Sequence, residues 1–137
     1  MNTPNRLPAF SKIKKIVLIE PDVAVRERYC ELLRAEKYEV YSAADGKAGF
    51  DLVVRELPDL VLLEVLLPKM DGFEVLHRMN QKKEMKDIPV LLITELGHAD
   101  DIARGRHLGA SEYLLKGHHS PEQVVKKVMS ILAAIKE

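Results

Sequence analysis

One apolar run of this chain is interrupted by a carboxylate, and it has the sequence Asp59-Leu60-Val61-Leu62-Leu63-Glu64-Val65-Leu66-Leu67-Pro68-Lys69-Met70-Asp71-Gly72. The unbroken aliphatic residues at its start are typical of a central strand that is buried on both faces of a parallel sheet. A carboxylate at the end of such a strand is costly to bury unless a partner or a chemical role compensates for it. Glu64 is therefore the first residue that needs an explanation.

The composition describes one domain of ordinary size. The 137 residues are 47% hydrophobic, which is enough to build a single core. Lys plus Arg and Asp plus Glu both number 21, so the net charge is zero and nothing favours nucleic acid or a membrane surface as a partner. Cys30, the single cysteine, fits a buried helix position in a reducing compartment. We expect a cytoplasmic protein with a flexible N-terminal tail over residues 1–11 and one domain over residues 12–137.

Apolar runs of strand length alternate with amphipathic runs of helix length. This alternation favours an α/β domain in which a parallel sheet is covered by helices on both faces. The five runs that we predict to be strands are Lys15 to Glu20, Glu39 to Ser42, Leu60 to Glu64, Pro89 to Thr94 and Glu112 to Leu115. The chain therefore has a (βα)5 pattern.

Capping residues mark the first three helices between these strands. Asp22, Asp45 and Asp71 each precede an amphipathic run and are expected to cap it. The second of these helices is expected to end before Pro58. The inner face of the third is expected to contain Phe73, Leu76 and Met79.

The last two helices differ in the clarity of their signals. A weakly marked helix is expected over roughly Asp100 to Leu108, interrupted by Gly105 and ended by a left-handed turn at Gly109. The final helix has a capping box and a first-turn proline, at Ser120, Pro121 and Gln123. Its expected apolar stripe is Val125, Val128, Leu132 and Ile135.

Polar side chains follow the predicted strands at their carboxyl ends. In an open parallel sheet, ligands and chemistry gather at this edge, near the point where the strand order reverses. The residues concerned are Glu20, Pro21, Asp22, Glu64, Thr94, Glu95 and Lys116. Acids, a hydroxyl and a lysine are thus expected to converge, which makes this edge the candidate functional site.

The chain resembles the receiver domains of bacterial two-component response regulators from about Lys14 to Ile135. Its most specific segments are Pro58-Asp59-Leu60, Leu67-Pro68-Lys69-Met70-Asp71-Gly72, Leu108-Gly109-Ala110-Ser111-Glu112-Tyr113 and Lys116. The resemblance implies a three-layer, doubly wound, flavodoxin-like fold with strand order 2-1-3-4-5. It also implies a site where an acidic pair and an aspartate hold Mg²⁺ and the aspartate takes a phosphoryl group from a histidine kinase. The metal and a lysine would neutralise the developing charge.

Three positions keep the residue types that the resemblance implies. Thr94 matches the switch hydroxyl that hydrogen-bonds the phosphoryl oxygens. Tyr113 matches the switch aromatic, which changes rotamer as the output face rearranges. Lys116 matches the charge-pairing lysine.

Three other positions depart from the family pattern. Glu64 matches the phosphoacceptor aspartate, and Pro21 matches one member of the acidic pair. Glu20 keeps the other member, while Asp22 follows on a different side of the turn. Gly117 stands where the family usually has a proline. These departures imply an atypical receiver, or pseudo-receiver, that lacks the acceptor aspartate.

The departures predict weak metal binding and slow phosphotransfer. Mg²⁺ needs near-octahedral oxygen ligands and loses one at Pro21, so no metal site is assigned. Glu20, Asp22 and Glu64 remain its weak candidates. The extra methylene of Glu64 moves its carboxylate outward by about 1.5 Å, and a displacement of that size can slow a catalysed step ~100-fold. It also places a negative charge near Lys116, which we expect to bias the switch without a kinase.

The residues leave three functions to compare. The leading expectation is a signalling module of a two-component (phosphorelay) system that is not an enzyme, needs no cofactor and acts by phosphorylation-independent protein–protein interaction. The alternative is a phosphorylatable, Mg-dependent receiver that uses Glu64 or a nearby acid. A flavodoxin-like nucleotide-binding enzyme is disfavoured because the chain has no G-x-G-x-x-G or G-x-x-x-x-G-K-[ST] motif and no nucleophile beside a base.

Expected partners are signalling proteins, such as a histidine kinase or an output protein, rather than nucleic acid or a membrane. A homodimer through the fourth helix, fifth strand and fifth helix is a further expectation. Arg104 and Arg106 are interpreted as ordinary charged surface, with a basic contact patch on that face as the alternative. The histidines at 98, 107, 118 and 119 are interpreted as solvated loop residues because no Cys or acid joins them at ligand spacing.

Overall fold

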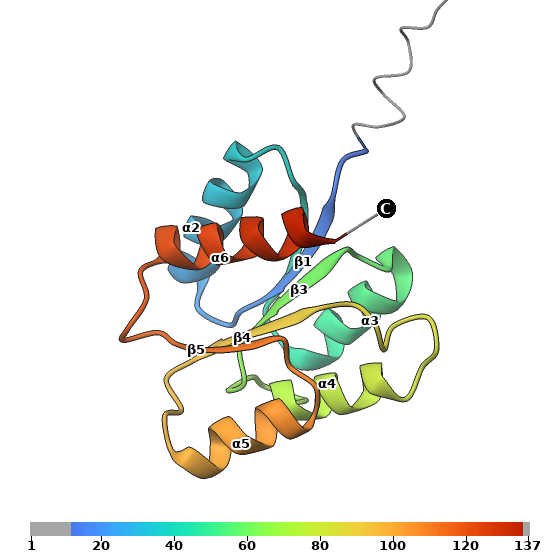
Figure 1. The fold of residues 1–137 in the computed structure, drawn as a ribbon, viewed down its shortest axis with the longest axis vertical. Helices are drawn as coiled ribbons and strands as arrows, with labels where there is room; N and C mark the ends of the chain where they lie inside the picture. Colours follow the sequence, from blue (N-terminus) through green and yellow to red (C-terminus); the bar gives the residue numbers. More distant parts are fainter. Residues whose placement is uncertain (1–11, 136–137) are drawn as a thin grey trace, which may run out of the picture.

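The computed structural model describes residues 12–135 and has five parallel strands between two layers of helices (Figure 1). The strands are β1 (Lys15–Ile19), β2 (Glu39–Ala43), β3 (Leu60–Leu63), β4 (Val90–Thr94) and β5 (Glu112–Leu115). The helices are α2 (Val23–Ala35), α3 (Gly46–Glu56), α4 (Gly72–Asn80), α5 (Ala99–His107) and α6 (Pro121–Ala134). The tail expected over residues 1–11 lies outside the described residues.

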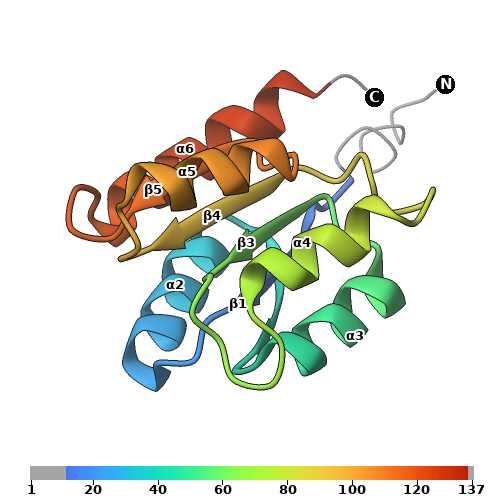
Figure 2. The same ribbon diagram turned by 90° about the horizontal axis from the view of Figure 1, so that it is seen from below.

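The strand order is β2-β1-β3-β4-β5, which confirms the predicted doubly wound topology. Helices α2 and α6 cover one face of the sheet, and α3, α4 and α5 cover the other (Figures 1 and 2). The order reverses at β1, which pairs in parallel with both β2 and β3. The loops after β1 and β3 therefore lie side by side at the carboxyl edge.

Alternate residues of the central strands feed two separate cores. Ile16 and Leu18 of β1 belong to the core beneath α2 and α6, whereas Val17 and Ile19 belong to the core beneath α3, α4 and α5. All four residues of β3 are buried, as the uninterrupted aliphatic run predicts. The carboxylate that follows this strand is thus held by a segment with no freedom to slide, since a shift of one residue would exchange its two faces.

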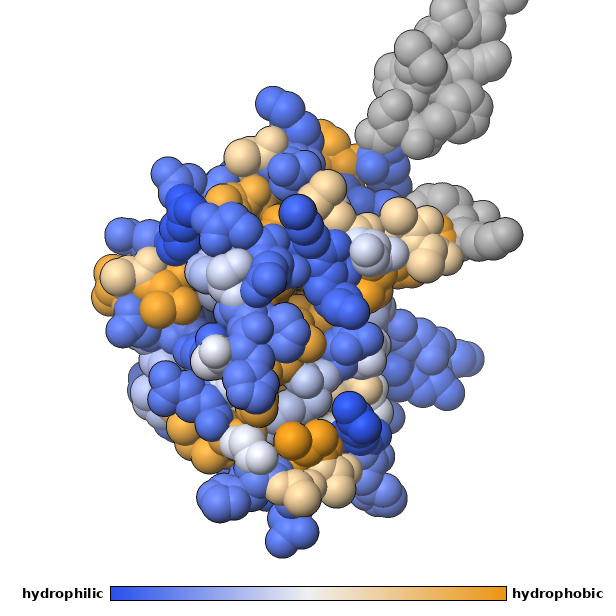
Figure 3. Space-filling view, turned by 60° about the vertical axis from the view of Figure 1, so that its left-hand side comes forward, coloured by the Kyte–Doolittle hydropathy of each residue, from blue (hydrophilic) through white to orange (hydrophobic). Residues whose placement is uncertain are grey.

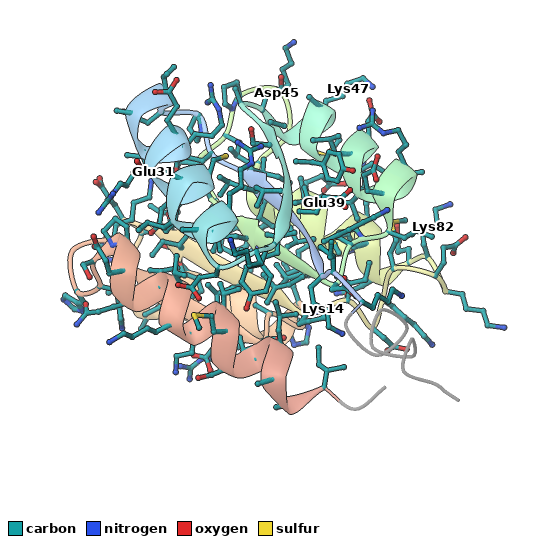
Figure 4. All side chains as sticks on the ribbon, turned by 90° about the horizontal axis from the view of Figure 1, so that it is seen from above. Lys14, Glu31, Glu39, Asp45, Lys47 and Lys82 are labelled. Carbon is teal, nitrogen blue, oxygen red and sulfur yellow. The ribbon has the colours of Figure 1, made fainter. Side chains whose placement is uncertain are left out.

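Side-chain caps begin four of the five described helices. The carboxylates of Asp22, Asp45 and Asp71 each accept the backbone N–H group three residues later, which confirms the predicted caps. Asp45 is labelled in Figure 4, at the start of α3. Ser120 and Gln123 form the predicted capping box of α6.

Two predicted details of the last two helices are wrong, whereas the approximate bounds of α5 and the turn at Gly109 are confirmed. Helix α5 spans Ala99–His107, within one residue of the predicted bounds at each end, and its cap residue His98 makes no side-chain capping bond. Gly105 does not interrupt α5, because it lies buried inside a continuous helix. Ile135 does not join the apolar stripe of α6, since the helix ends at Ala134 and Ile135 is 40% exposed. Gly109 has a φ of 96°, as the predicted left-handed turn requires.

The face of the molecule shown in Figure 3 is mainly polar. In Figure 3, apolar residues form separate small groups among hydrophilic ones. At the edge of the sheet, the guanidinium of Arg34 in α2 donates to the carbonyl oxygen of Val40 in β2 at 2.9 Å. None of the helices within residues 12–135 has the length and apolarity that crossing a membrane requires.

Gly72, the first residue of α4, packs directly on the backbone that holds Glu64. Its N–H donates to the Val65 carbonyl at 2.8 Å. A methyl carbon added to Gly72 would lie 2.4 Å from the carbonyl oxygen of Glu64 and 2.8 Å from Cα of Val65. Backbone atoms of a buried strand end cannot move aside as a flexible side chain can, so this close approach requires glycine.

We predict that Gly72→Ala lowers the free energy of unfolding by about 1–3 kcal/mol through overpacking against this backbone. Urea denaturation followed by circular dichroism measures the change. Gly117→Ala is the matched control, because a methyl carbon at Gly117 meets no atom within 4 Å, and its change should stay within about 0.5 kcal/mol. Equal stabilities of the two variants would contradict the close approach at Gly72.

Candidate functional site

The parallel sheet carries polar residues from four strands to its carboxyl edge. Thr94 ends β4, and Glu20, Glu64 and Lys116 come directly after β1, β3 and β5. The ladder continues through their backbones, because Glu64 N donates to the carbonyl of the neighbouring strand β1 at 3.0 Å, and Lys116 N donates to the Thr94 carbonyl at 2.9 Å. These bonds fix where each side chain starts.

The ammonium group of Lys116 lies between two buried glutamates. Its Nζ is 2.8 Å from Oε1 of Glu20 and 2.6 Å from Oε1 of Glu64. Glu20 is 2% exposed and Glu64 is 4% exposed. Burial alone would lower the pKa of Lys116, but the hydrogen bonds and negative charges of the two carboxylates raise it above its ordinary value. With all three groups ionised, the cluster carries one excess negative charge.

The second oxygen of Glu64 is held by the turn that follows β3. Oε2 accepts the backbone N–H of Val65 at 2.7 Å and that of Leu66 at 3.0 Å. Two successive N–H groups that converge on one oxygen form a small anion-binding concavity. Both carboxylate oxygens of Glu64 therefore have donors: Oε1 has the Lys116 ammonium, and Oε2 has two backbone amides.

The turn between β1 and α2 holds the Glu20 carboxylate in the cluster, whereas it directs the Asp22 carboxylate toward the start of α2. Oε2 of Glu20 accepts the backbone N–H of Asp22 at 2.9 Å. Oδ1 of Asp22 accepts from Val25 N at 3.0 Å as the cap of α2. Within residues 12–135, Asp22 has no hydrogen bond or ion pair with Glu64 or Lys116. Glu20, Glu64 and Lys116 are thus brought together, and the Asp22 side chain is not.

Arg26 is a member of the site that the sequence analysis missed. Its guanidinium Nη1 donates to the carbonyl of Glu20 at 2.8 Å and to that of Pro21 at 3.3 Å. It thereby fixes the turn in which Pro21 stands. The only signal in the sequence is an arginine one turn into a capped helix, which also fits a solvated surface position.

Thr94 and Tyr113 both contact Leu96, in the loop after β4. Oγ1 of Thr94 accepts the Leu96 N–H at 3.4 Å, and the Tyr113 hydroxyl donates to the Leu96 carbonyl at 2.7 Å. Tyr113 is 8% exposed, so its ring lies inward. Burial and the negative charges of Asp101 and Glu64 raise the pKa of Tyr113. No hydrogen bond between Thr94 and Glu64 occurs in the described part of the chain.

The histidines gather no metal-ligand set. Among the described residues, no group of three His, Cys, Asp or Glu side chains is placed to hold a metal ion. His98 is an exposed residue of the loop before α5, as predicted, whereas His107 is exposed but lies in the last turn of that helix rather than in a loop. Nδ1 of His119 lies 3.3 Å from the Leu115 carbonyl. The guanidinium of Arg104 lies 4.5 Å from the centre of the Phe73 ring, so it is committed to a contact with α4.

Comparison with known proteins gives the family. The model of the response regulator receiver domain family matches residues 16–129. The chain is 36% identical over 118 residues to the DNA-binding dual master transcriptional regulator RpaA of a Synechocystis species. The aligned residues make up 86% of this chain and 48% of RpaA. It is 40% identical over 101 residues to the response regulator PleD of Caulobacter vibrioides, covering 73% of this chain and 22% of PleD. The chain thus spans about half, or less, of these relatives.

Solved structures agree with this match. The Mn²⁺-bound form of response regulator Rcp1 superimposes with a TM-score of 0.79 at 29% identity, covering 90% of this chain and 97% of that one. A CheY-like receiver domain protein from Methanospirillum hungatei gives a TM-score of 0.82 at 24% identity, covering 89% and 95%, and supports the fold alone. On the match to residues 16–129, this chain belongs to the response regulator receiver domain family.

Proposed function

We propose that this receiver domain signals through protein–protein interaction that does not depend on phosphorylation. In this proposal Glu64 holds the place of the acceptor aspartate, and Pro21 holds that of one metal-binding aspartate. The observation that carries the proposal is the engagement of both Glu64 oxygens, Oε1 by Lys116 Nζ at 2.6 Å and Oε2 by two backbone N–H groups.

The contacts of Glu64 oppose its use as a phosphoryl acceptor. An accepting carboxylate must offer an oxygen lone pair to the phosphorus atom of the donor. Hydrogen bonds to a charged group are roughly twice as strong as neutral ones, so releasing a Glu64 oxygen costs free energy before any bond forms. The residue is also 4% exposed, which limits the approach of a phosphodonor.

The donor set of the acidic turn does not fit Mg²⁺. Pro21 has no side-chain oxygen, and the Asp22 carboxylate caps α2. Both oxygens of Glu20 have donors, Lys116 Nζ and the Asp22 N–H. An ion that demands six nearly octahedral oxygen ligands would have to break these contacts. We therefore propose that the domain works without a metal cofactor.

The contacts of Glu64 also support a role for its carboxylate as a permanent substitute for the phosphoryl group. Its carboxylate brings a negative charge to Lys116 and to the N–H groups of Val65 and Leu66, which are donors suited to an anionic oxygen. Tyr113 is inward in the same structure. The Thr94 hydroxyl is not part of this substitution, because its hydrogen bond is to Leu96. We propose that the charge of Glu64 keeps the domain in one signalling state without a kinase.

Partner proteins are proposed to bind the surface formed by α5, β5 and α6, in a cytoplasmic signalling system. The same surface is proposed for a homodimer. RpaA is named as DNA-binding, but this chain covers about half of RpaA and has zero net charge. We therefore propose signalling proteins rather than nucleic acid as direct partners of this domain.

We predict that the natural protein keeps its mass after incubation with acetyl phosphate and Mg²⁺. Its acceptor position offers no free oxygen, and its acidic turn lacks a ligand. The measurement is intact-protein mass spectrometry of the untreated and treated protein. The Pro21→Asp, Glu64→Asp double variant is the positive control, and it should gain the mass of one phosphoryl group.

The outcomes of the mass experiment support or contradict the proposal that signalling does not depend on phosphorylation. A phosphoryl gain by the natural protein would show that Glu64 or a neighbouring acid is a working acceptor, and the proposal would be wrong. A gain by the variant alone supports the proposal. If neither protein gains mass, Pro21 and Glu64 do not explain the loss of chemistry, and that part of the proposal fails.

We predict that Lys116→Met lowers the free energy of unfolding by about 3–5 kcal/mol, because it leaves two buried carboxylates without their cation. Adding Glu64→Gln removes one of these charges, so the double variant should be more stable than Lys116→Met alone. Urea denaturation at neutral pH compares the proteins. Lys126→Met, at an exposed position of α6, is the control and should change stability by less than about 0.5 kcal/mol. A Lys116→Met protein as stable as the natural one would rule out the buried ion triad.

A further inference from the structure

Gly105 leaves room that the Tyr113 ring fills. Helix α5 is continuous through Gly105, which is buried. A methyl carbon added there would lie 2.7 Å from Cδ2 and 3.0 Å from Cε2 of Tyr113, and 2.9 Å from Cδ1 of Leu92. Favourable carbon–carbon contacts begin at about 3.5 Å. The inward ring and a side chain at position 105 therefore exclude each other.

The other end of the Tyr113 ring is fixed by a hydrogen bond. Its hydroxyl donates to the Leu96 carbonyl at 2.7 Å, while the Leu96 N–H donates to Thr94. Gly105 borders the ring, and Leu96 holds its tip. The aromatic side chain thus has one well-defined inward position between α5 and the loop after β4.

Helix α5 is held in place by the residue next to Gly105. The guanidinium of Arg104 lies 4.5 Å from the centre of the Phe73 ring, and Phe73 is 3% exposed at the start of α4. Phe73 follows Gly72, whose position is set by close packing on the Glu64 carbonyl. The Arg104–Phe73 contact opposes a retreat of α5 from Tyr113. The ring, rather than the helix, should therefore move if a side chain is placed at position 105.

We propose that Gly105 is a positioning residue that keeps Tyr113 inward and so sets the shape of the surface formed by α5 and β5. The inference rests on the proposed function, because it explains how an inward switch aromatic is maintained without a phosphoryl group. Gly105 is then a second determinant of the inward Tyr113 position, and it acts through space rather than charge. Glu64 provides the anion at the carboxyl edge, and Gly105 provides the space on α5.

The first test is the solvent exposure of the Tyr113 ring in Gly105→Ala. Protein with ¹³C-labelled tyrosine rings is studied by NMR with a soluble gadolinium chelate, and Tyr113 is assigned by its loss in Tyr113→Phe. We expect the ring to be protected in the natural protein and to relax several-fold faster in Gly105→Ala. Tyr29, which is 2% exposed, is the internal reference and should stay protected in both. Gly117→Ala should leave the Tyr113 signal unchanged.

The same variant should also shift a titration. Burial contributes most to the raised pKa of Tyr113. Movement of the ring into solvent should therefore return the pKa of its phenol toward its ordinary value, about 10, in Gly105→Ala. The tyrosine ¹³Cζ shift followed against pH measures this change. A role limited to helix packing would leave the titration where it is in the natural protein.

A double-mutant cycle separates the ring from the helix. By helix propensity alone, Gly105→Ala should raise the Tm by about 3 °C. We expect that rise only in a Tyr113→Ala background, where the missing ring also leaves space into which the neighbouring Leu92 side chain can shift, and a lower Tm when Tyr113 is present. Folding of the double variant but not of Gly105→Ala alone would also support the proposal. A protected Tyr113 ring in Gly105→Ala, with equal Tm rises in both backgrounds, would overturn it.

Failure of this inference is distinguishable from failure of the proposed function. The ring measurement uses protein that has met no phosphodonor and no partner. A phosphoryl gain by the natural protein in the mass experiment would overturn phosphorylation independence and leave the ring result standing. A mobile helix with a fixed ring would overturn the role of Gly105 and leave the mass result standing.

Discussion

The contact of one ammonium with two carboxylates, Lys116 with Glu20 and Glu64, ties together strands that are not all neighbours in the sheet. Glu20 follows β1, Glu64 follows β3, and Lys116 follows the edge strand β5. Two buried carboxylates at one edge would repel each other without the cation, and a buried lysine would be costly without the acids. The arrangement of the carboxyl edge follows from this mutual requirement. The turn after β1, the turn after β3 and the loop after β5 must each deliver a group to one point.

The backbone around this cluster completes what the charges begin. Each glutamate oxygen that does not face Lys116 accepts an amide N–H, from Asp22 for Glu20 and from the turn after β3 for Glu64. Buried carboxylates are tolerated when their remaining lone pairs are satisfied in this way. Gly72 allows α4 to start directly against that second turn. Packing, hydrogen bonding and charge thus specify one geometry for Glu64.

Much of this could be predicted from the sequence, because the signals involved are local. The aliphatic run of β3, the aspartate caps and the capping box of α6 each depend on a few adjacent residues. The convergence of Glu64 and Lys116 followed from strand ends meeting at one edge, and their pairing followed from the resemblance to receiver domains. The role of Asp22 as a cap was also visible, but its absence from the ion cluster depends on which way the turn faces. Arg26 and Gly105 were missed or misinterpreted because their contacts are with the backbone of a turn and with an aromatic ring on another element. Such contacts leave no periodicity in the sequence.

The guanidinium of Arg34 on the Val40 carbonyl has a consequence for the behaviour of the domain at high concentration. In β2, Glu39 and Ala43 direct their backbone groups toward β1, so those of Val40 and Ser42 face outward from the sheet. An open edge of this kind is a template on which another chain can add a strand and begin aggregation. Arg34 occupies the acceptor at Val40 and places a positive charge over the short edge. Growth of the sheet at β2 is thereby obstructed, which leaves β5 as the sheet edge on which another chain could add a strand.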